Sequence, residues 1–379
     1  MSRSIKRAFM SLIGIHDELY GLDHAILNVT VPPDKLWMNM GYWKDTTSFP
    51  HACQALLDQV LLFAGLLSQQ NIPAITPSFP SHSRERETTV KRSQYEQHAK
   101  IRLIDVGFGC GDQSLYLTRK LDRIIEPSET PLPESAVDAG NNGDGTTASN
   151  QDFRPLFDSY IGINITPSQV DIAKKRLLKA SSEDHTSSLH STPKVELFVA
   201  DAGNPASWDL RLKEAVYSRV AHNTEQDAKP AAKVQTWLLA LDTLYHFKPS
   251  RTPLFECAHR DMQASIMAFD LLLSESASLW DRFRLRLMCL VAGIPYSNFM
   301  TEKEYRAMLG LAGYEQDMID MQNISKDVFA GIADYIRRRE LELETYGMTV
   351  GKFKAPAKVF DWWARSGVVQ GFVVIAHRT

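Results

Sequence analysis

A glycine-rich turn constrains the fold of this chain more than any other feature of its sequence. Segment 101–106 is apolar and predicts a strand, the turn reads Asp105-Val-Gly-Phe-Gly-Cys-Gly-Asp112, and residues 112–121 have a helical pattern. Glycines let a ligand approach the backbone closely, and a helix begins with free N–H groups. The dinucleotide spacing G-x-G-x-x-G fails at Asp112, and a phosphate-binding lysine is missing. The turn predicts a site for a nucleotide-like ligand without a phosphate; a tight turn with no ligand is the alternative.

Further strands and helices are expected to alternate after this turn. A strand at 160–163 is followed by Thr166-Pro167-Ser168-Gln169, a capping box with proline at the first helical position, which predicts a helix to about residue 180. The other predicted strands are 195–199, 234–240 and 266–273, with a helix at 253–263 before the last. Such alternation is typical of an α/β fold, a parallel sheet with helices on both faces.

The rest of the chain divides into polar inserts and a less regular C-terminal part. Polar inserts are predicted at 71–98, 127–152, 182–193 and 222–233, and the one at 127–152 is expected to be disordered. After an apolar segment at 280–295, Thr301-Glu302-Lys303-Glu304 is a second capping box, opening a helix that ends near Gly310 or Gly313. The remaining predictions are a strand at 316–324, helices at 326–346 and 356–366, and a final strand at 371–376.

Charge and cysteine content exclude several functional classes. The formal net charge is −3, whereas a nucleic-acid-binding surface needs a basic excess. The four cysteines form no closely spaced pair, so we predict neither a metal site nor a disulfide framework. No apolar run approaches the roughly 18 residues of a spanning helix. We expect a cytoplasmic protein with a small-molecule substrate and without a nucleic-acid partner or an integral membrane segment.

Several segments resemble a known enzyme family. Segment 101–111 resembles the first motif of class I S-adenosylmethionine-dependent methyltransferases, and 162–169 is similar to the second-strand segment of their small-molecule subgroup. That subgroup includes tocopherol methyltransferases, cyclopropane fatty acid synthases and rebeccamycin-type sugar O-methyltransferases. Other similar pieces are Ala200-Asp201-Ala202, 240–247, Met38-Asn-Met-Gly41-Tyr42-Trp43 and 360–367. The resemblance covers about residues 35–379, inserts excepted.

The resemblance implies a fold and a division of the chain. The expected fold is a Rossmann-like seven-stranded class I methyltransferase sheet with a helical N-terminal cap and a lid insertion. Its last two strands, 316–324 and 371–376, would form an antiparallel hairpin. The implied parts are a cap at 1–70, a polar insert at 71–99, a cofactor-binding core at 100–278, a lid at 279–300 and a C-terminal part of the core at 301–379.

The same resemblance implies S-adenosyl-L-methionine as cofactor. Asp105 would receive its methionine amino group and Asp201 its adenine amino group. The other implied cofactor-binding residues are Tyr42, Gly107, Gly109, Gly111, Asn164, Gln169, Ala202 and Leu241. Asn164 stands where many members carry a ribose-binding acid, and 259–264 replaces the usual Pro-Gly-Gly turn before the fifth strand. An amide can still bond ribose hydroxyls.

Two residues are candidates for catalysis. His246 follows the fourth strand, where the resemblance places the catalytic histidine of O-methyltransferases, and a histidine can act as general base. Asp270 lies within the apolar fifth strand, where a buried acid needs a partner such as His246 or a substrate hydroxyl. The alternative for His246 is a loop residue that only shapes the pocket. The alternative for Asp270 is an acid that reaches the polar end of its strand.

The expected reaction is O-methylation of a natural-product hydroxyl. N- or C-methylation on the same scaffold, cyclopropanation and cofactor binding without methyl transfer are the other interpretations. Four aromatic residues have two interpretations. They either line the site around the cofactor sulfonium or the methyl acceptor, or they belong to the hydrophobic core: Tyr42, Trp43, Trp362 and Trp363.

Overall fold

A computed structural model describes residues 33–67, 100–119, 121–123, 153–183, 193–217 and 234–378. The predicted inserts at 71–98, 127–152 and 222–233 lie outside the described residues, as do most of the insert at 182–193 and the first 32 residues of the predicted cap.

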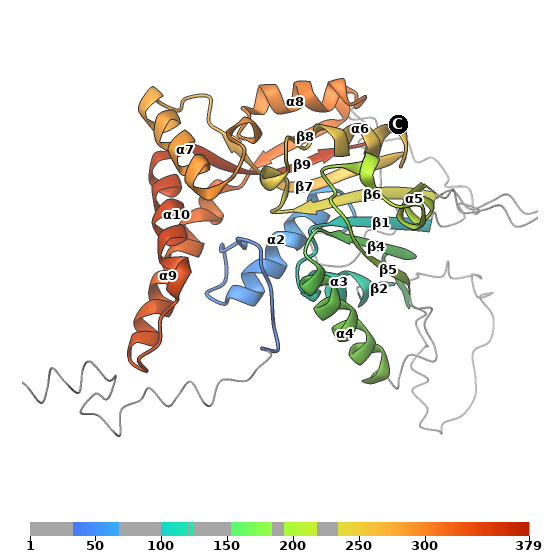
Figure 1. The fold of residues 1–379 in the computed structure, drawn as a ribbon, viewed down its shortest axis with the longest axis horizontal. Helices are drawn as coiled ribbons and strands as arrows, with labels where there is room; N and C mark the ends of the chain where they lie inside the picture. The colour runs from blue at the N-terminus through green and yellow to red at the C-terminus, as the bar shows by residue number, and fades with distance from the viewer. Residues whose placement is uncertain are drawn as a thin grey trace, which may run out of the picture.

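Seven strands form one sheet, in the order β5-β4-β1-β6-β7-β9-β8 (Figure 1). Strand β9 is antiparallel to both β7 and β8, and the other pairs are parallel. The predicted α/β fold class, with seven strands and an antiparallel last pair, is confirmed. The strands are Lys100–Val106 (β1), Ser159–Asn164 (β4), Lys194–Val199 (β5), Val234–Leu241 (β6), Ala264–Leu273 (β7), Ile319–Asn323 (β8) and Val369–Ala376 (β9).

Helices cover both faces of the sheet because side chains alternate between two cores along each strand. Trp237 and Leu239 of β6 enter the core beneath one set of helices, while Leu238 and Ala240 enter the core beneath the other. The first set is α2 (Phe49–Phe63), α3 (Asp112–Arg119), α7 (Leu279–Ala292), α9 (Phe329–Glu344) and α10 (Lys354–Ser366). The second set is α5 (Leu210–Tyr217), α6 (Thr252–Arg260) and α8 (Glu302–Leu311). Helix α4 (Pro167–Glu183) packs beside α3.

Strand order reverses at the centre of the sheet. From β1 the chain builds outward through β4 to β5, then returns to place β6 on the other side of β1. In open α/β sheets, ligands bind outside the carboxyl ends of the strands at such a reversal. The carboxyl ends of β1 and β6 are therefore the expected binding position.

Only one of the two predicted capping boxes forms. In α8, Thr301 accepts from the backbone N–H of Glu304, and the Glu304 carboxylate accepts from the N–H of Thr301. At α4, the N–H of Thr166 donates instead to Asn164 Oδ1 at 3.1 Å, and the Gln169 side chain also turns to Asn164. The capping box predicted at Thr166 was wrong because Asn164, at the end of β4, competes for the same groups.

Two other predictions need adjustment. Residues 316–318 form a 3-10 turn, η6 (Gln316–Met318), so β8 begins later than predicted; helix α9 likewise begins after a 3-10 turn, η7 (Ser325–Asp327). A short hairpin of β2 (Leu121–Arg123) and β3 (Phe153–Pro155) was not predicted, because three-residue strands carry no periodic signal.

Candidate cofactor and active site

The glycine turn joins the end of β1 to the start of α3 in a left-handed backbone. Gly107, Gly109 and Gly111 have φ of 80°, 64° and 96°, which L side chains rarely adopt. A Cβ at Gly107 would lie 2.7 Å from Thr243 Oγ1, and one at Gly111 would lie 2.9 Å from the Cα of Ala173. Gly107 and Gly111 are thus required for packing against the β6 loop and α4, respectively.

Gly109 differs from its two neighbours. The nearest atom to a Cβ placed there is the Sδ of Met38, at 3.3 Å, and the next two also belong to Met38. That side chain is flexible and 59% exposed. The backbone at Gly109 is therefore the part of the turn that a ligand could approach by displacing one methionine side chain.

Alanine at Gly111 should destabilise the fold more than alanine at an open left-handed glycine. A left-handed residue with a side chain costs about 1–2 kcal/mol, and crowding against Ala173 adds about 1–3 kcal/mol. Gly293, with φ 67° and no atom within 4 Å of a Cβ, supplies the matched control. Urea unfolding should show a larger loss for Gly111→Ala than for Gly293→Ala; equal losses would mean that α4 yields to the new methyl group.

Asp105 lies beneath the turn and is fully buried. Gln113 Nε2 donates to its two carboxylate oxygens at 2.8 and 2.9 Å, and the Tyr160 hydroxyl donates to Oδ2 at 2.6 Å. Burial raises the pKa of Asp105 to about 7, although both donors act in the opposite direction. These contacts hold β1, β4 and α3 together, and the role of Asp105 toward the cofactor amino group stays a prediction.

Asn164 and Gln169 also support the turn. The Asn164 amide donates to the carbonyl of Gly109 at 3.4 Å and to Gln169 Oε1 at 2.9 Å. Asn164 is buried, and its oxygen accepts from Thr166. These bonds tie the turn to α4, so a role of Asn164 toward ribose hydroxyls would require it to exchange partners.

The remaining predicted cofactor residues lie at the carboxyl ends of β5 and β6. Asp201 Oδ1 accepts from the N–H of Gly203 at 2.8 Å, and its carbonyl accepts from the Trp208 ring. Ala202 and Leu241 are buried, and Leu241 belongs to the core beneath α2. Asp201 is partly exposed and remains available to a ligand.

His246 ends a 3-10 turn, η4 (Leu244–His246), that follows β6. The same loop contains Thr243, against which Gly107 packs, so the glycine turn and the histidine loop touch. The His246 ring lies 4.2 Å from the Tyr245 ring, centroid to centroid. Although part of the His246 side chain is exposed, desolvation by its neighbours, and secondarily the charge of Lys248, lower its pKa below the usual 6.5. The imidazole is therefore neutral at pH 7 and able to accept a proton.

Asp270 has a different partner from the one predicted. It is fully buried on the face of β7 covered by α6 and α8, where Arg251, also fully buried, forms an ion pair with it. Tyr305 donates to the same carboxylate at 3.0 Å. Neither His246 nor any solvent-exposed position meets this group, because the alternation along β7 turns Asp270 away from the α2 side. The expected pairing with His246 was wrong.

Sequence reasoning missed how segment 34–43 crosses the carboxyl edge of the sheet. The N–H of Leu36 donates to Asp112 at 2.7 Å, at the start of α3, and the N–H of Met40 donates to Asp242 at 2.8 Å, at the end of β6. Between them Met38 lies over Gly109. The resemblance of residues 38–43 to the family was the available signal, but it pointed to Tyr42.

Tyr42 itself faces elsewhere. Its N–H donates to the carbonyl of Ala52, and burial together with the nearby Asp327 raises the pKa of its hydroxyl. These contacts place Tyr42 beside α2 and η7, so they give no support to its predicted role in cofactor binding.

Asp242 is a second residue that sequence reasoning missed. It has a left-handed backbone, with φ 59°, which is uncommon for a residue with a side chain. Burial raises the pKa of its carboxyl to about 7, although the N–H of Met40 and the Tyr245 hydroxyl, which both donate to this carboxyl, act in the opposite direction. The segment 240–247 had been noticed for its histidine alone.

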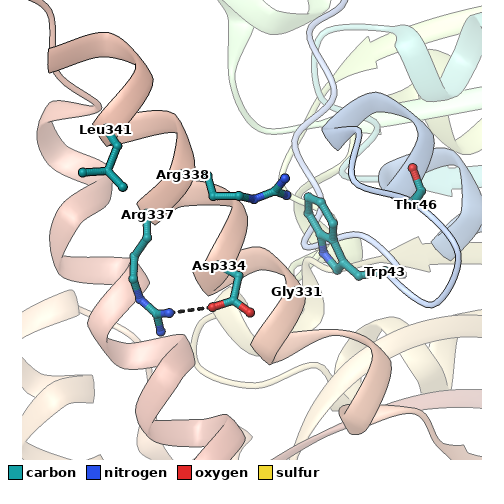
Figure 2. Close-up of a pocket in the computed structure, with 7 residues that line it drawn as sticks. All are labelled: Trp43, Thr46, Gly331, Asp334, Arg337, Arg338 and Leu341. Carbon is teal, nitrogen blue, oxygen red and sulfur yellow. Dashed lines mark hydrogen bonds and ion pairs between the residues drawn. The ribbon is translucent and has the colours of Figure 1, made fainter. Parts of the chain in front are cut away.

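Two hollows border segment 34–43. One, of about 550 Å³, lies between this segment and α3 and is lined by Trp37, Asp112 and Tyr116 among others. The other, of about 410 Å³, lies against α9 (Figure 2). In it Arg338 extends toward the Trp43 ring, while Arg337 pairs with Asp334.

Two of the predicted aromatic residues have different structural roles: Trp363 belongs to the hydrophobic core, and Trp43 contacts helix α9. Trp363 is buried against Phe299 and Phe329, as the core interpretation predicts. Trp43 packs on Gly331, where a Cβ would lie 2.2 Å from its ring, and this contact anchors segment 34–43 to α9.

Comparisons with known proteins give fold-level likeness only. No family model matches the sequence, and no curated protein matches it. Among solved structures, the cyclase SpnF is 14% identical, with 95% of this chain and 94% of that chain covered and a TM-score of 0.48. The cyclopropane synthase MmaA2 from Mycobacterium tuberculosis is 12% identical, with 89% of each chain covered and a TM-score of 0.47. A geranyl diphosphate C-methyltransferase from Streptomyces coelicolor is 14% identical, with 74% and 72% covered and a TM-score of 0.40. Likeness at these levels identifies neither a substrate nor a reaction.

Proposed function

We propose that this chain is an S-adenosylmethionine-dependent methyltransferase acting on a small-molecule hydroxyl. The observation that carries the proposal is the contact between the glycine turn after β1 and the His246 loop after β6, made where Gly107 packs on Thr243. This contact, at the edge where the strand order reverses, supports a cofactor site on the turn with His246 as a nearby base.

The residues at this edge fit the cofactor. A ligand could approach the backbone at Gly109 by displacing the flexible Met38 side chain, and α3 begins immediately after the turn. Asp201 is partly exposed at the end of β5 for an adenine amino group. The bound cofactor would supply a methyl group on a positively charged sulfur.

His246 acts as the general base in this proposal. Its lowered pKa keeps the imidazole unprotonated at neutral pH, so it can take the proton of an acceptor hydroxyl as the oxygen attacks the methyl carbon. Segment 34–43 covers the cofactor and excludes water, which aligns the reacting groups.

The first test is titration of the purified protein with S-adenosylhomocysteine. We expect binding by the wild type and at least about a hundredfold weaker binding by Gly109→Arg, because the new side chain would occupy the space under Met38 and lose ligand contacts worth roughly 3 kcal/mol. Gly293→Arg is the matched control, since its φ of 67° is close to the 64° of Gly109 and its surroundings are open. If the folded wild type does not bind, the methyltransferase proposal fails.

Other acceptors would leave a different signature. A neutral nitrogen acceptor gains less from a base than a hydroxyl does, because its lone pair attacks before any proton is lost, so His246→Ala would slow its methylation less. Cofactor binding without turnover of any acceptor would indicate a protein that binds S-adenosylmethionine without transferring its methyl group.

A further inference from the structure

The outer face of helix α7 is apolar and exposed. Six large apolar side chains there have exposed fractions between 53% and 88%, far more than core residues of this type have. These residues, called here the α7 outer face, are Leu279, Trp280, Phe283, Leu287, Leu290 and Val291.

Helical geometry places all six in one stripe. With about 100° between successive residues, they fall within about 120° of the helix surface. On the opposite side, Leu285 and Cys289 are buried in the core. Helix α7 therefore has two apolar faces, and the described residues cover only the inner one.

Arginines line both edges of this stripe. The same 100° spacing between residues places Arg284 next to one edge of the stripe. It places Arg286 next to the other edge, with Arg282 farther from the stripe on that side. Arg284 stacks on the Trp362 ring at 4.5 Å and Arg286 on the Tyr296 ring at 4.8 Å, while Arg282 donates to the carbonyl of Ala277. Within the described parts of the chain, no ion pair neutralises these three guanidinium groups.

We propose that the α7 outer face binds the surface of a bilayer that contains anionic lipid. Leucine, phenylalanine and tryptophan side chains in one stripe can enter the boundary between headgroups and acyl chains. Arginines along its edges would meet the lipid phosphates, each adding electrostatic attraction. No helix in the described residues is long and apolar enough to cross a membrane, so α7 would lie in the plane of the interface.

Charge disfavours a second copy of this chain as the occupant. In a symmetric dimer the same face of each copy meets the other. Because arginines line both edges, each edge would then oppose arginines of the other copy, and like charges repel. An anionic lipid surface supplies the opposite charge along both edges.

The test is flotation of the full chain with vesicles and does not depend on methyl transfer. We expect binding to vesicles of phosphatidylcholine mixed with phosphatidylglycerol, weaker binding to phosphatidylcholine alone, and a decline with added salt. Trp280→Ser combined with Phe283→Ser should abolish it. Each of Arg284→Gln and Arg286→Gln should lower the partition coefficient about fivefold.

A matched control distinguishes binding by the α7 outer face from nonspecific binding by any exposed apolar side chain. Leu178→Ser combined with Leu210→Ser removes two apolar side chains that are 72% and 78% exposed on α4 and α5, and it should bind as the wild type does. Unchanged thermal unfolding would show that each variant is folded. Failure of the wild type to bind the mixed vesicles would overturn the proposal, as would binding that survives in the Trp280 and Phe283 variant. A wild-type dimer that this variant dissociates, with no vesicle binding, would identify the face as an interface between copies.

Discussion

His246→Ala should lower kcat for a hydroxyl acceptor about 10²- to 10⁴-fold while leaving the affinity for S-adenosylhomocysteine nearly unchanged. The imidazole follows β6 and is proposed to take the acceptor proton, whereas the glycine turn holds the cofactor. Steady-state kinetics and ligand titration of the same preparation measure the two quantities separately. A fall in affinity equal to the fall in kcat would contradict the role as base and indicate that His246 shapes the cofactor site.

The pH profile provides an independent measurement of the same role. Because the pKa of His246 is lowered, the base is protonated and inactive only at acid pH, and kcat should rise with pH to a plateau before neutrality, with a midpoint below 6.5. Lys248→Met removes the positive charge that contributes to this lowering, so it should move the midpoint to higher pH. His259→Gln, on α6 near the amino end of β7, should leave both the midpoint and kcat as in the wild type.

Arg251→Met should lower the free energy of unfolding by about 3–5 kcal/mol, the cost of leaving a buried charge without its partner. The Asp270 carboxylate would keep only the Tyr305 hydroxyl and the N–H of Leu271 as donors. Urea unfolding, read by fluorescence, measures the loss. The double change Arg251→Met with Asp270→Leu should recover much of it, because neither charge then remains buried.

An exposed ion pair is the matched control for this prediction. Arg339 pairs with Glu342 one turn along α9, with side chains 52% and 60% exposed. Arg339→Met should therefore cost no more than about 1 kcal/mol. A similarly small loss for Arg251→Met would mean that water enters to solvate Asp270.

The buried pair also has a consequence for the proposed active site. Arg251 donates to the carbonyl of Asn298, and the Asn298 side chain donates to the carbonyls of Tyr245 and Phe247, at 3.1 and 2.8 Å. These two carbonyls flank His246 in the chain. In the proposed mechanism Arg251 and Asn298 would therefore act as positioning residues, because the Asn298 side chain holds the backbone of the histidine loop.

Most of the strands could be predicted because their signals are local. Apolar runs of a few residues, each followed by a turn and a helical pattern, marked β1, β4, β5, β6 and β7 to within two residues. The capping box of α8 was equally local and correct. The box at α4 failed because Asn164, a residue of the preceding strand, also reaches the helix start.

Local patterns were enough to predict the parallel α/β frame, the glycine turn and the place of His246 after the fourth strand, since these depend on backbone preferences and on short-range patterns of apolar residues. The three-dimensional structure was needed to show that Asp270 pairs with Arg251, that Met38 lies over Gly109, and that Asp242 accepts from the N–H of Met40. Each of these depends on which side chains from distant segments share a buried space. Desolvation and close packing select those partners, and neither leaves a periodic mark along the chain.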